Sequence, residues 1–240
     1  MKKIKVSIVL PAFNAEDTID DVLSALSKLT FVNEVILVDD CSSDKTLEIA
    51  DNWDIIIVKH EENLGYGGNQ KTCYREAIKI NSDIVVMFHP DYQYDIDSIE
   101  SMVNLIKTNN YSYVLGSRID SICKMHKQGM PFYKIFANRI LTFFMNKITG
   151  INLSEWHTGL RAYSGEYIRS IPYWEFRNDF LFDTQMTIEA IRKEVKIGEI
   201  SSRFSYNSTA SVIKFTSALK YSILSLLFCI EYYTGKNKIL

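Results

Sequence analysis

The chain lacks the patterns that mark secreted, zinc-binding and nucleic-acid-binding proteins. Its four cysteines include no C-x-x-C pair, so the sequence predicts neither a zinc site nor a disulfide framework. No Lys/Arg block dominates any segment and the net charge is -2, so bulk charge predicts no nucleic-acid partner. We therefore expect a protein of the reducing cytoplasm.

Long uninterrupted apolar runs are also missing. Three lysines precede VSIVL as in a signal peptide, but Pro11 and the polar residues after it cut the apolar stretch short. Near the other end, Lys220 and Glu231 interrupt residues 218–233, which fall short of the ~20 apolar residues that a membrane span requires. Three alternatives stay open for this amphipathic C-terminal helix, within residues 211–240: packing on the sheet, packing against a second copy in a homo-oligomer, and lying on the cytoplasmic face of a membrane.

Glycine is absent where a dinucleotide fingerprint would need it. The first strand leads into PAFNAED, which contains no glycine, and this argues against a dehydrogenase. NLGYGGNQKT places three glycines before a helix, but Gln70 breaks the G-x-G-x-x-G spacing and no P-loop signature follows. Gly67 is predicted either to let an anionic ligand approach free backbone amides or to allow a tight turn.

Apolar residues make up 47% of the chain, and short apolar runs alternate with helical patterns through its first half. This alternation predicts a doubly wound, mostly parallel α/β sheet with helices on both faces. The expected strands are VSIVLPAF, VILVDD, IIIVKH, IVVMF and YVLGS, and the expected helices are 15–29, 44–53, 65–80 and 97–109. After Arg118 the alternation ends, and we expect helices at 132–148, 180–194 and 216–233 with a strand at 197–204.

Acidic residues follow two of the expected strands. IVVMF is followed by Asp91, Gln93 and Asp95, and VILV is followed by Asp39 and Asp40. Ligand sites in such sheets lie outside the carboxyl ends of the strands. The first group could hold a divalent cation against a phosphate, or merely end the strand and cap the next helix. The second pair could hold hydroxyl or amino groups of a ribose or base.

Three charged residues of the second half are further candidates. Arg118 and Arg161 could neutralise a diphosphate or an anionic acceptor, because arginine favours bidentate contact with phosphate. Glu155 lies in the turn SEWHTG, with an exposed turn acid as the alternative reading. His157 in the same turn is predicted to be a hydrogen-bonded structural histidine.

Six motifs in this order resemble glycosyltransferase family 2: VSIVLPAFNAEDTI, VILVDDCSSDKT, NLGYGGNQ, HPDYQYD, VLGSRI and SEWHTGLRAYS. The resemblance covers about residues 6–203 and is strongest to the dolichyl-phosphate mannosyltransferase and polyprenyl-phosphate glycosyltransferase branch. It implies the GT-A fold, a nucleotide-diphosphate sugar donor, a Mg or Mn ion, and inversion at the anomeric carbon. It also divides one domain, residues 1–210, into a nucleotide-sugar-binding half, 1–118, and an acceptor half, 119–210.

The resemblance implies roles by position. The nucleotide-sugar-binding residues expected from it are Pro11, Asn14, Glu16, Asp39, Gly67, Asp91, Gln93 and Arg161, and the expected catalytic residues are Asp91, Arg118 and Glu155. Asp91 matches the second acid of the family's D-x-D motif, and His89 stands where many relatives have the first. Histidine ligates Mn but suits Mg poorly, so the expected metal ligands are Asp91, Gln93 and His89 and the ion is left as Mg or Mn.

The function expected from the resemblance is metal-dependent, inverting transfer of a sugar to a polyprenyl phosphate. Such a phosphate is already an anionic nucleophile and needs no general base, whereas a sugar hydroxyl needs one, for which Glu155 is the candidate. Two alternatives stay open: a cell-surface glycan as acceptor, and a catalytically silent nucleotide-sugar-binding protein, suggested by His89.

Overall fold

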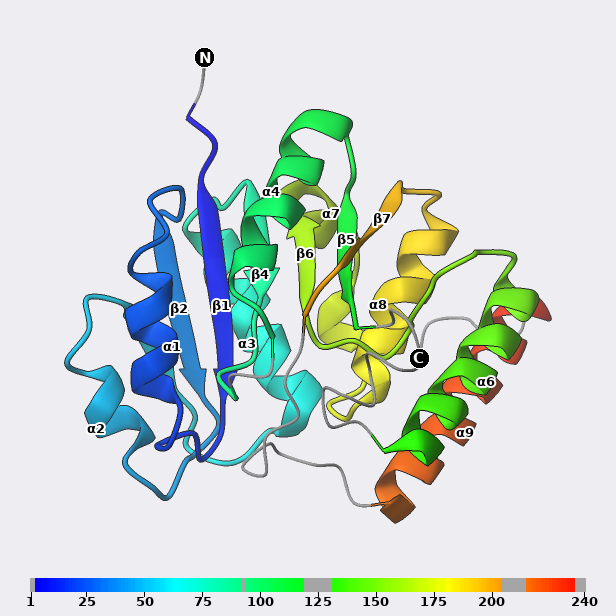
Figure 1. Ribbon diagram of the computed structural model, residues 1–240, viewed down its shortest axis with the longest axis horizontal. Coiled ribbons are helices and arrows are strands. Elements are labelled where there is room, and N and C mark those ends of the chain that lie inside the picture. Colours follow the sequence, from blue (N-terminus) through cyan, green and yellow to red (C-terminus); the bar gives the residue numbers. More distant parts are fainter. Residues whose placement is uncertain (1–2, 92–93, 119–130, 204–214, 236–240) are drawn as a thin grey trace.

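The computed structural model describes residues 3–91, 94–118, 131–203 and 215–235. Within these ranges the chain forms a seven-stranded sheet with helices on both faces, in the order β3-β2-β1-β4-β6-β5-β7 (Figure 1). The strands are β1 (Val6–Ala12), β2 (Glu34–Asp39), β3 (Ile56–Lys59), β4 (Ile84–Met87), β5 (Tyr113–Ser117), β6 (Arg161–Ser164) and β7 (Ile197–Ser201). Strands from both halves of the chain therefore join in one sheet.

The pairing is parallel except around β6, which is antiparallel to both β4 and β5. The predicted α/β fold with a mostly parallel sheet is confirmed. β6 itself was not predicted, because RAYS is only four residues long and carries an arginine and a serine, whereas a buried strand is expected to be apolar.

Helices form in all seven predicted regions, and one short helix at residues 165–170 was not predicted. They are α1 (Ile19–Leu26), α2 (Thr46–Ala50), α3 (Gly65–Lys79), α4 (Asp97–Asn109), α6 (Phe132–Thr149), α7 (Gly165–Ser170), α8 (Leu181–Arg192) and α9 (Phe215–Tyr233), with a 3-10 turn η1 (Tyr173–Glu175). The prediction for α4 matches at both ends, but α1 begins four residues later than predicted. The reason is the loop before it, which is bound to the loop after β2 instead of continuing the helix.

Alternate residues of the central strands fill two cores, one on each face of the sheet. Ile8 and Leu10 of β1 belong to the core under α1 and α4, whereas Val9 belongs to the core under α3 and α8. Each core is continuous from β2 across to β5. The carboxyl ends of β1, β2 and β4 are thereby held at one edge of a rigid scaffold.

Helices α6 and α9 lie side by side at the end of the molecule far from α2 (Figure 1). α9 also packs against α8. Among the residues that the structure describes, none of the helices has the length and apolar content to cross a membrane.

Candidate functional site

The loops after β1 and β2 are joined by their own side chains. Asn14 adopts a left-handed conformation, with φ of 51°, and its Oδ1 accepts a hydrogen bond of 2.9 Å from the Ser43 amide. Glu16 Oε2 accepts from the Lys45 amide at 3.0 Å. Pro11 lies opposite Val38 near the ends of the two strands. The predicted nucleotide-contacting residues of this region therefore lie on one preformed surface.

Asp39 and Asp40, although adjacent, have different surroundings. Asp39 is fully buried; its Oδ2 accepts from the Ser42 amide at 3.0 Å, and its Oδ1 is buried with no hydrogen-bond partner among the described residues. Asp40 accepts from His60 Nδ1 at 2.7 Å and from the Leu64 amide at 2.8 Å. Asp39 thus keeps one carboxylate oxygen without a donor among the described residues, whereas both carboxylate oxygens of Asp40 accept from the protein and organise the glycine-containing turn.

Gly67 does not offer a free amide to an anion. Its N–H donates to the Asn178 carbonyl at 2.7 Å, and a Cβ on this residue would lie 2.4 Å from the Arg177 carbonyl oxygen. The prediction that Gly67 binds the nucleotide sugar directly is therefore corrected. The glycine is needed because the segment before α8 packs directly on the first turn of α3.

Asp91 and His89 lie just beyond β4, as predicted, and both are half-buried. Burial lowers the pKa of His89 below its ordinary value, although the nearby charges of Asp91 and Asp183 act to raise it. Gln93 lies outside the described residues. Asp95 Oδ1 accepts from the Asp97 amide at 3.1 Å and so caps α4, which is the turn alternative that the sequence left open.

The hydrogen bonds around Tyr66 define the tautomer of His89. The Tyr66 hydroxyl has one hydrogen, and it donates this to Asp183 Oδ2 at 2.8 Å. His89 Nε2 lies 3.2 Å from the same hydroxyl oxygen, so Nε2 must be the donor in that contact. A neutral His89 then carries its lone pair on Nδ1.

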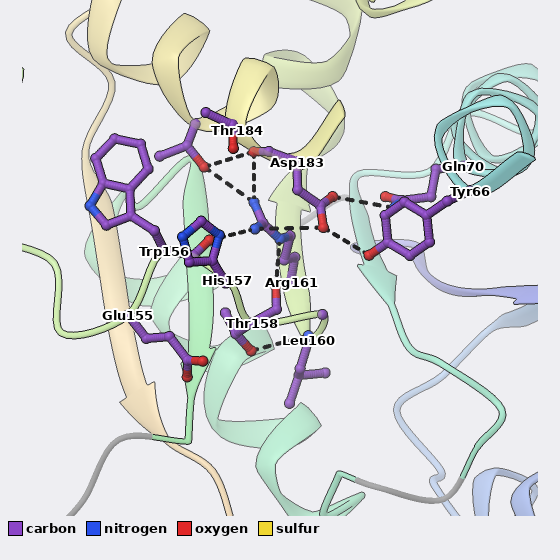
Figure 2. Close-up of polar contacts among 12 residues, drawn as sticks. Tyr66, Gln70, Glu155, Trp156, His157, Thr158, Leu160, Arg161, Asp183 and Thr184 are labelled. Atoms are coloured by element: carbon purple, nitrogen blue, oxygen red, sulfur yellow. Dashed lines mark hydrogen bonds and ion pairs between the residues drawn. The ribbon is translucent and has the colours of Figure 1, made fainter. Parts of the chain in front are cut away.

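Arg161 lies in the interior, surrounded by protein acceptors (Figure 2). Its Nε donates to the Thr158 carbonyl at 2.9 Å, and one of its terminal nitrogens donates to the Trp156 carbonyl at 3.0 Å. The other terminal nitrogen donates to Tyr113 and to the Asp183 carbonyl. Because the side chain is fully buried and its donors are in use, the predicted direct contact of Arg161 with the diphosphate is corrected. The arginine holds the acidic turn and Asp183 in place instead.

Glu155 and Arg118, both predicted as catalytic, bind each other. Glu155 is fully buried, and its carboxylate accepts from the Arg118 amide at 2.8 Å, from the Arg118 guanidinium, and from Asn138 of α6 at 3.0 Å. Burial alone would raise the pKa of Glu155, but the Arg118 charge and these hydrogen bonds lower it below its ordinary value. The exposed turn acid is therefore excluded. Glu155 is an ionised structural partner of Arg118 in this state.

His157 confirms the prediction of a hydrogen-bonded structural histidine. Its Nδ1 lies 3.0 Å from the Tyr221 hydroxyl of α9, and burial lowers its pKa to about 4.

Three contributors to this region were missed in the sequence. Tyr66 of α3 donates a hydrogen bond to Asp183 of α8 although the two are 117 residues apart. Asn138 of α6 donates a hydrogen bond to Glu155. A polar residue inside the apolar helical pattern FLFDT was the one signal that could have pointed to Asp183.

Asp91 and His89, just beyond β4, are the described residues of the predicted metal-ligand set. Among the described residues no group of three or more His, Cys, Asp or Glu side chains is placed to hold a metal by itself. Asp91 and the Nδ1 of His89 could supply two ligands, and a carboxylate with an imidazole suits Mn better than Mg.

Comparison with known proteins gives the same family as the motifs. A sequence model of the family described as Glycosyl transferase family 2 matches residues 7–171. An uncharacterized protein of Methanocaldococcus jannaschii is 30% identical over 219 residues, covering 89% of this chain and 88% of the relative. The UDP-N-acetylglucosamine–dolichyl-phosphate N-acetylglucosaminyltransferase of Methanococcus voltae is 28% identical, covering 80% of this chain and 82% of the relative.

A further sequence relative and a solved structure extend the comparison. The undecaprenyl-phosphate 4-deoxy-4-formamido-L-arabinose transferase of Photorhabdus laumondii is 28% identical, over 93% of this chain and 68% of the relative. Glucosyl-3-phosphoglycerate synthase of Mycobacterium tuberculosis, solved with Mn2+, UDP and phosphoglyceric acid, superposes with a TM-score of 0.71 at 18% identity, covering 95% of this chain and 78% of that one. The fold is the GT-A fold.

Proposed function

Because this chain belongs to glycosyltransferase family 2, we propose that it transfers a sugar, with inversion, from a nucleoside-diphosphate sugar to a polyprenyl phosphate at the cytoplasmic face of a membrane. Two relatives that align over most of this chain are named as transferases acting with dolichyl phosphate and undecaprenyl phosphate. Their names support the acceptor class. The donor base and the sugar are left to experiment.

The observation that carries the acceptor class is the pairing of Glu155 with Arg118. A hydroxyl acceptor must lose a proton to a base, whereas a phosphate monoester attacks as an anion. Glu155 is the carboxylate that a base mechanism would use, yet it is fully buried, ionised and bound to Arg118 and Asn138. Its carboxylate oxygens are occupied by protein donors, which favours an acceptor that brings its own negative charge.

The remaining residues fit the binding of a nucleoside-diphosphate sugar. Oδ1 of Asp39, which has no hydrogen-bond partner within the part of the chain that the structure describes, would accept from a base N–H or a ribose hydroxyl. The neighbouring loop of Pro11, Asn14 and Glu16 would line the nucleoside. Asp91 and His89 would hold Mn or Mg together with the diphosphate. The ion would stabilise the charge that develops on the leaving diphosphate.

A silent nucleotide-sugar-binding protein is the second candidate, and turnover separates it from an enzyme. We would first measure thermal shifts with UDP-, GDP-, CDP- and TDP-sugars, each with Mg and with Mn, to identify the donor. The labelled donor would then be incubated with polyprenyl phosphate, and label would be counted in the lipid extract. A silent binding protein would give a shift and no labelled lipid.

Asp91→Asn and Asp95→Asn form the matched pair for this assay. Asp91→Asn should lower turnover about 100-fold or more because a metal ligand is lost, with an unchanged melting temperature. Asp95→Asn keeps a residue type that caps helices well, so it should remain active. Near-normal transfer by Asp91→Asn would contradict the assignment of Asp91 as a metal ligand.

A further inference from the structure

The exposed large apolar side chains gather on one part of the molecule. Of the thirteen that the described residues contain, six lie on α6 and four on α9. They are Phe132, Tyr133, Phe136, Ile140, Phe143 and Phe144 on α6, and Ile223, Leu227, Ile230 and Tyr233 on α9. Exposed apolar side chains that gather on neighbouring elements mark an interaction site more often than isolated exposed residues do. We call these ten residues the α6/α9 face.

The α6/α9 face is distinct from the sides of the two helices that pack inward. On α6, Ile135 and Met145 are buried, whereas Phe136 and Phe143 are 68% and 60% exposed. The exposed set 136, 140, 143 repeats at helical spacing, which places it along one side of α6. On α9 the exposed set 223, 227, 230 does the same, opposite the buried Ser225 and Cys229.

The basic residues of these helices favour an anionic partner over a second copy of the chain. α6 carries Lys134, Arg139 and Lys147 and no acidic residue, although the whole chain has a net charge of -2. α9 adds Lys220 at its first turns and Glu231 near its end. Two copies meeting through α6 would bring six basic side chains together, and α6 carries no acidic residue. An anionic lipid surface would attract the same charges.

We propose that the α6/α9 face docks on an anionic phospholipid bilayer, with its aromatic and aliphatic side chains inserted at the headgroup level. A helix with aromatic and aliphatic residues on one side and basic residues beside them is the pattern that lies in a membrane interface without crossing it. The two helices that carry these exposed side chains lie side by side (Figure 1).

The inner sides of the same two helices hold the acidic turn of the site. Asn138 of α6 donates to Glu155 at 3.0 Å, and Asn146 of α6 accepts from Trp156 Nε1 at 2.7 Å. Tyr221 of α9 contacts His157 at 3.0 Å. Docking would therefore place the Arg118 and Glu155 region next to the lipid headgroups. This link to the acceptor rests on the proposed function, whereas docking itself does not.

Vesicle flotation, without donor or acceptor, tests the docking. The wild-type protein is expected to float with phosphatidylcholine vesicles that contain phosphatidylglycerol, to bind pure phosphatidylcholine more weakly, and to lose binding as salt is raised. The double variant Phe136→Asp/Phe143→Asp should bind the anionic vesicles at least about ten-fold more weakly, because two aromatic rings can no longer leave water. Trp174→Asp is the control, since Trp174 is 60% exposed but lies on η1 outside the face.

Two outcomes would overturn the proposal. One is equal vesicle binding by the wild type and the double variant, with both shown to be folded by circular dichroism and nucleotide binding. The other is a wild-type protein that does not bind vesicles but sediments as a dimer, with the double variant as a monomer, which would assign the face to a second copy. Vesicle flotation measures no sugar transfer. A negative result would therefore contradict membrane docking without contradicting the proposed polyprenyl-phosphate acceptor.

Discussion

At the scale of single residues, Glu155 has the environment of a structural carboxylate. Its pKa is lowered in the folded protein, so the stability that it contributes is fully present above its ordinary pKa of 4.5 and is lost as the pH falls through the lower folded value. Glu155→Gln should lower the free energy of unfolding at neutral pH by up to about 3 kcal/mol, since it breaks a buried ion pair.

Urea unfolding at several pH values measures this loss. The difference between Glu155→Gln and the wild type should shrink as the wild-type carboxylate becomes protonated at acidic pH. In the transfer assay the variant should keep the pH dependence of the wild type, because Glu155 removes no proton from a phosphate acceptor. Loss of the acidic limb of the pH profile in the variant would identify Glu155 as a base and contradict this account, because a general base loses activity when it is protonated at low pH.

Tyr66 acts on the candidate cation site through His89. Its hydroxyl joins Asp183 and His89 Nε2, and this contact leaves Nδ1 of His89 with the lone pair. Tyr66→Phe should weaken Mn2+ binding in the presence of a nucleoside diphosphate about 10- to 100-fold, the usual effect of removing a partner that orients a metal ligand.

The measurement is a Mn2+ titration followed by electron paramagnetic resonance, with 15N NMR of His89 to report its tautomer. Tyr74→Phe is the control, because Tyr74 lies on the same helix but its hydroxyl donates to Gln70 at 2.8 Å. If Tyr66→Phe binds Mn2+ as the wild type does and His89 keeps its Nε2 proton, the hydroxyl does not orient this histidine.

At the scale of elements, the segment before α8 can pack closely on α3 only because residue 67 is a glycine. A methyl group at this position would lie 2.4 Å from the Arg177 carbonyl oxygen and 2.8 Å from Phe182 Cβ. Neither neighbour is the flexible end of a side chain, so the backbone must shift. Gly67→Ala should therefore lower the free energy of unfolding by about 1–3 kcal/mol, the usual cost of overpacking.

Gly150→Ala is the comparison for this effect. Gly150 ends α6 with φ of 76°, and a Cβ there would meet nothing within 4 Å. Its substitution should cost about 1 kcal/mol of backbone strain and leave nucleotide binding unchanged. Urea unfolding of the two variants separates steric crowding from conformational strain. An equal loss in the free energy of unfolding for Gly67→Ala and Gly150→Ala would argue against crowding at Gly67.

The elements that the sequence predicted are those with a strong period. The first five strands and α4 follow from apolar runs alternating with amphipathic segments, and their order determines which loops meet at the sheet edge. β6 escaped prediction because its four residues include Arg161, whose charge is compensated by partners distant in sequence. No local pattern contains that information.

The same reasoning explains which candidate residues lie at the strand ends where they were predicted. Asp39, Asp91 and the Asn14 loop could be predicted because strand ends expose whatever follows them. The direct ligand contacts predicted for Arg161 and Gly67 were wrong because a sequence identifies a hydrogen-bond donor but not the protein acceptor to which it donates in the fold. Asp183 and Tyr66 could not be paired from the sequence, since their contact exists only after α3 and α8 pack on the sheet.

At the scale of the whole molecule, one sheet edge carries Asp39 and Asp91, while two helices at the far end hold the acidic turn. The GT-A scaffold keeps the Asp39 and Asp91 loops at one edge. α6 and α9 tie Glu155, Trp156 and His157 to the apolar α6/α9 face. This arrangement fits an enzyme that takes its donor from water and its acceptor from a lipid surface.

The central claim is that the acceptor is a phosphate that needs no protein base, and a pair of acceptors that differ in one group tests it most directly. The donor identified by thermal shift would be offered, with Mn, to a polyprenyl phosphate and to the polyprenol of the same chain length. We predict labelled product with the phosphate and none with the alcohol. Transfer to the alcohol that disappears in Glu155→Gln would contradict the account, because it would show a hydroxyl acceptor activated by that carboxylate.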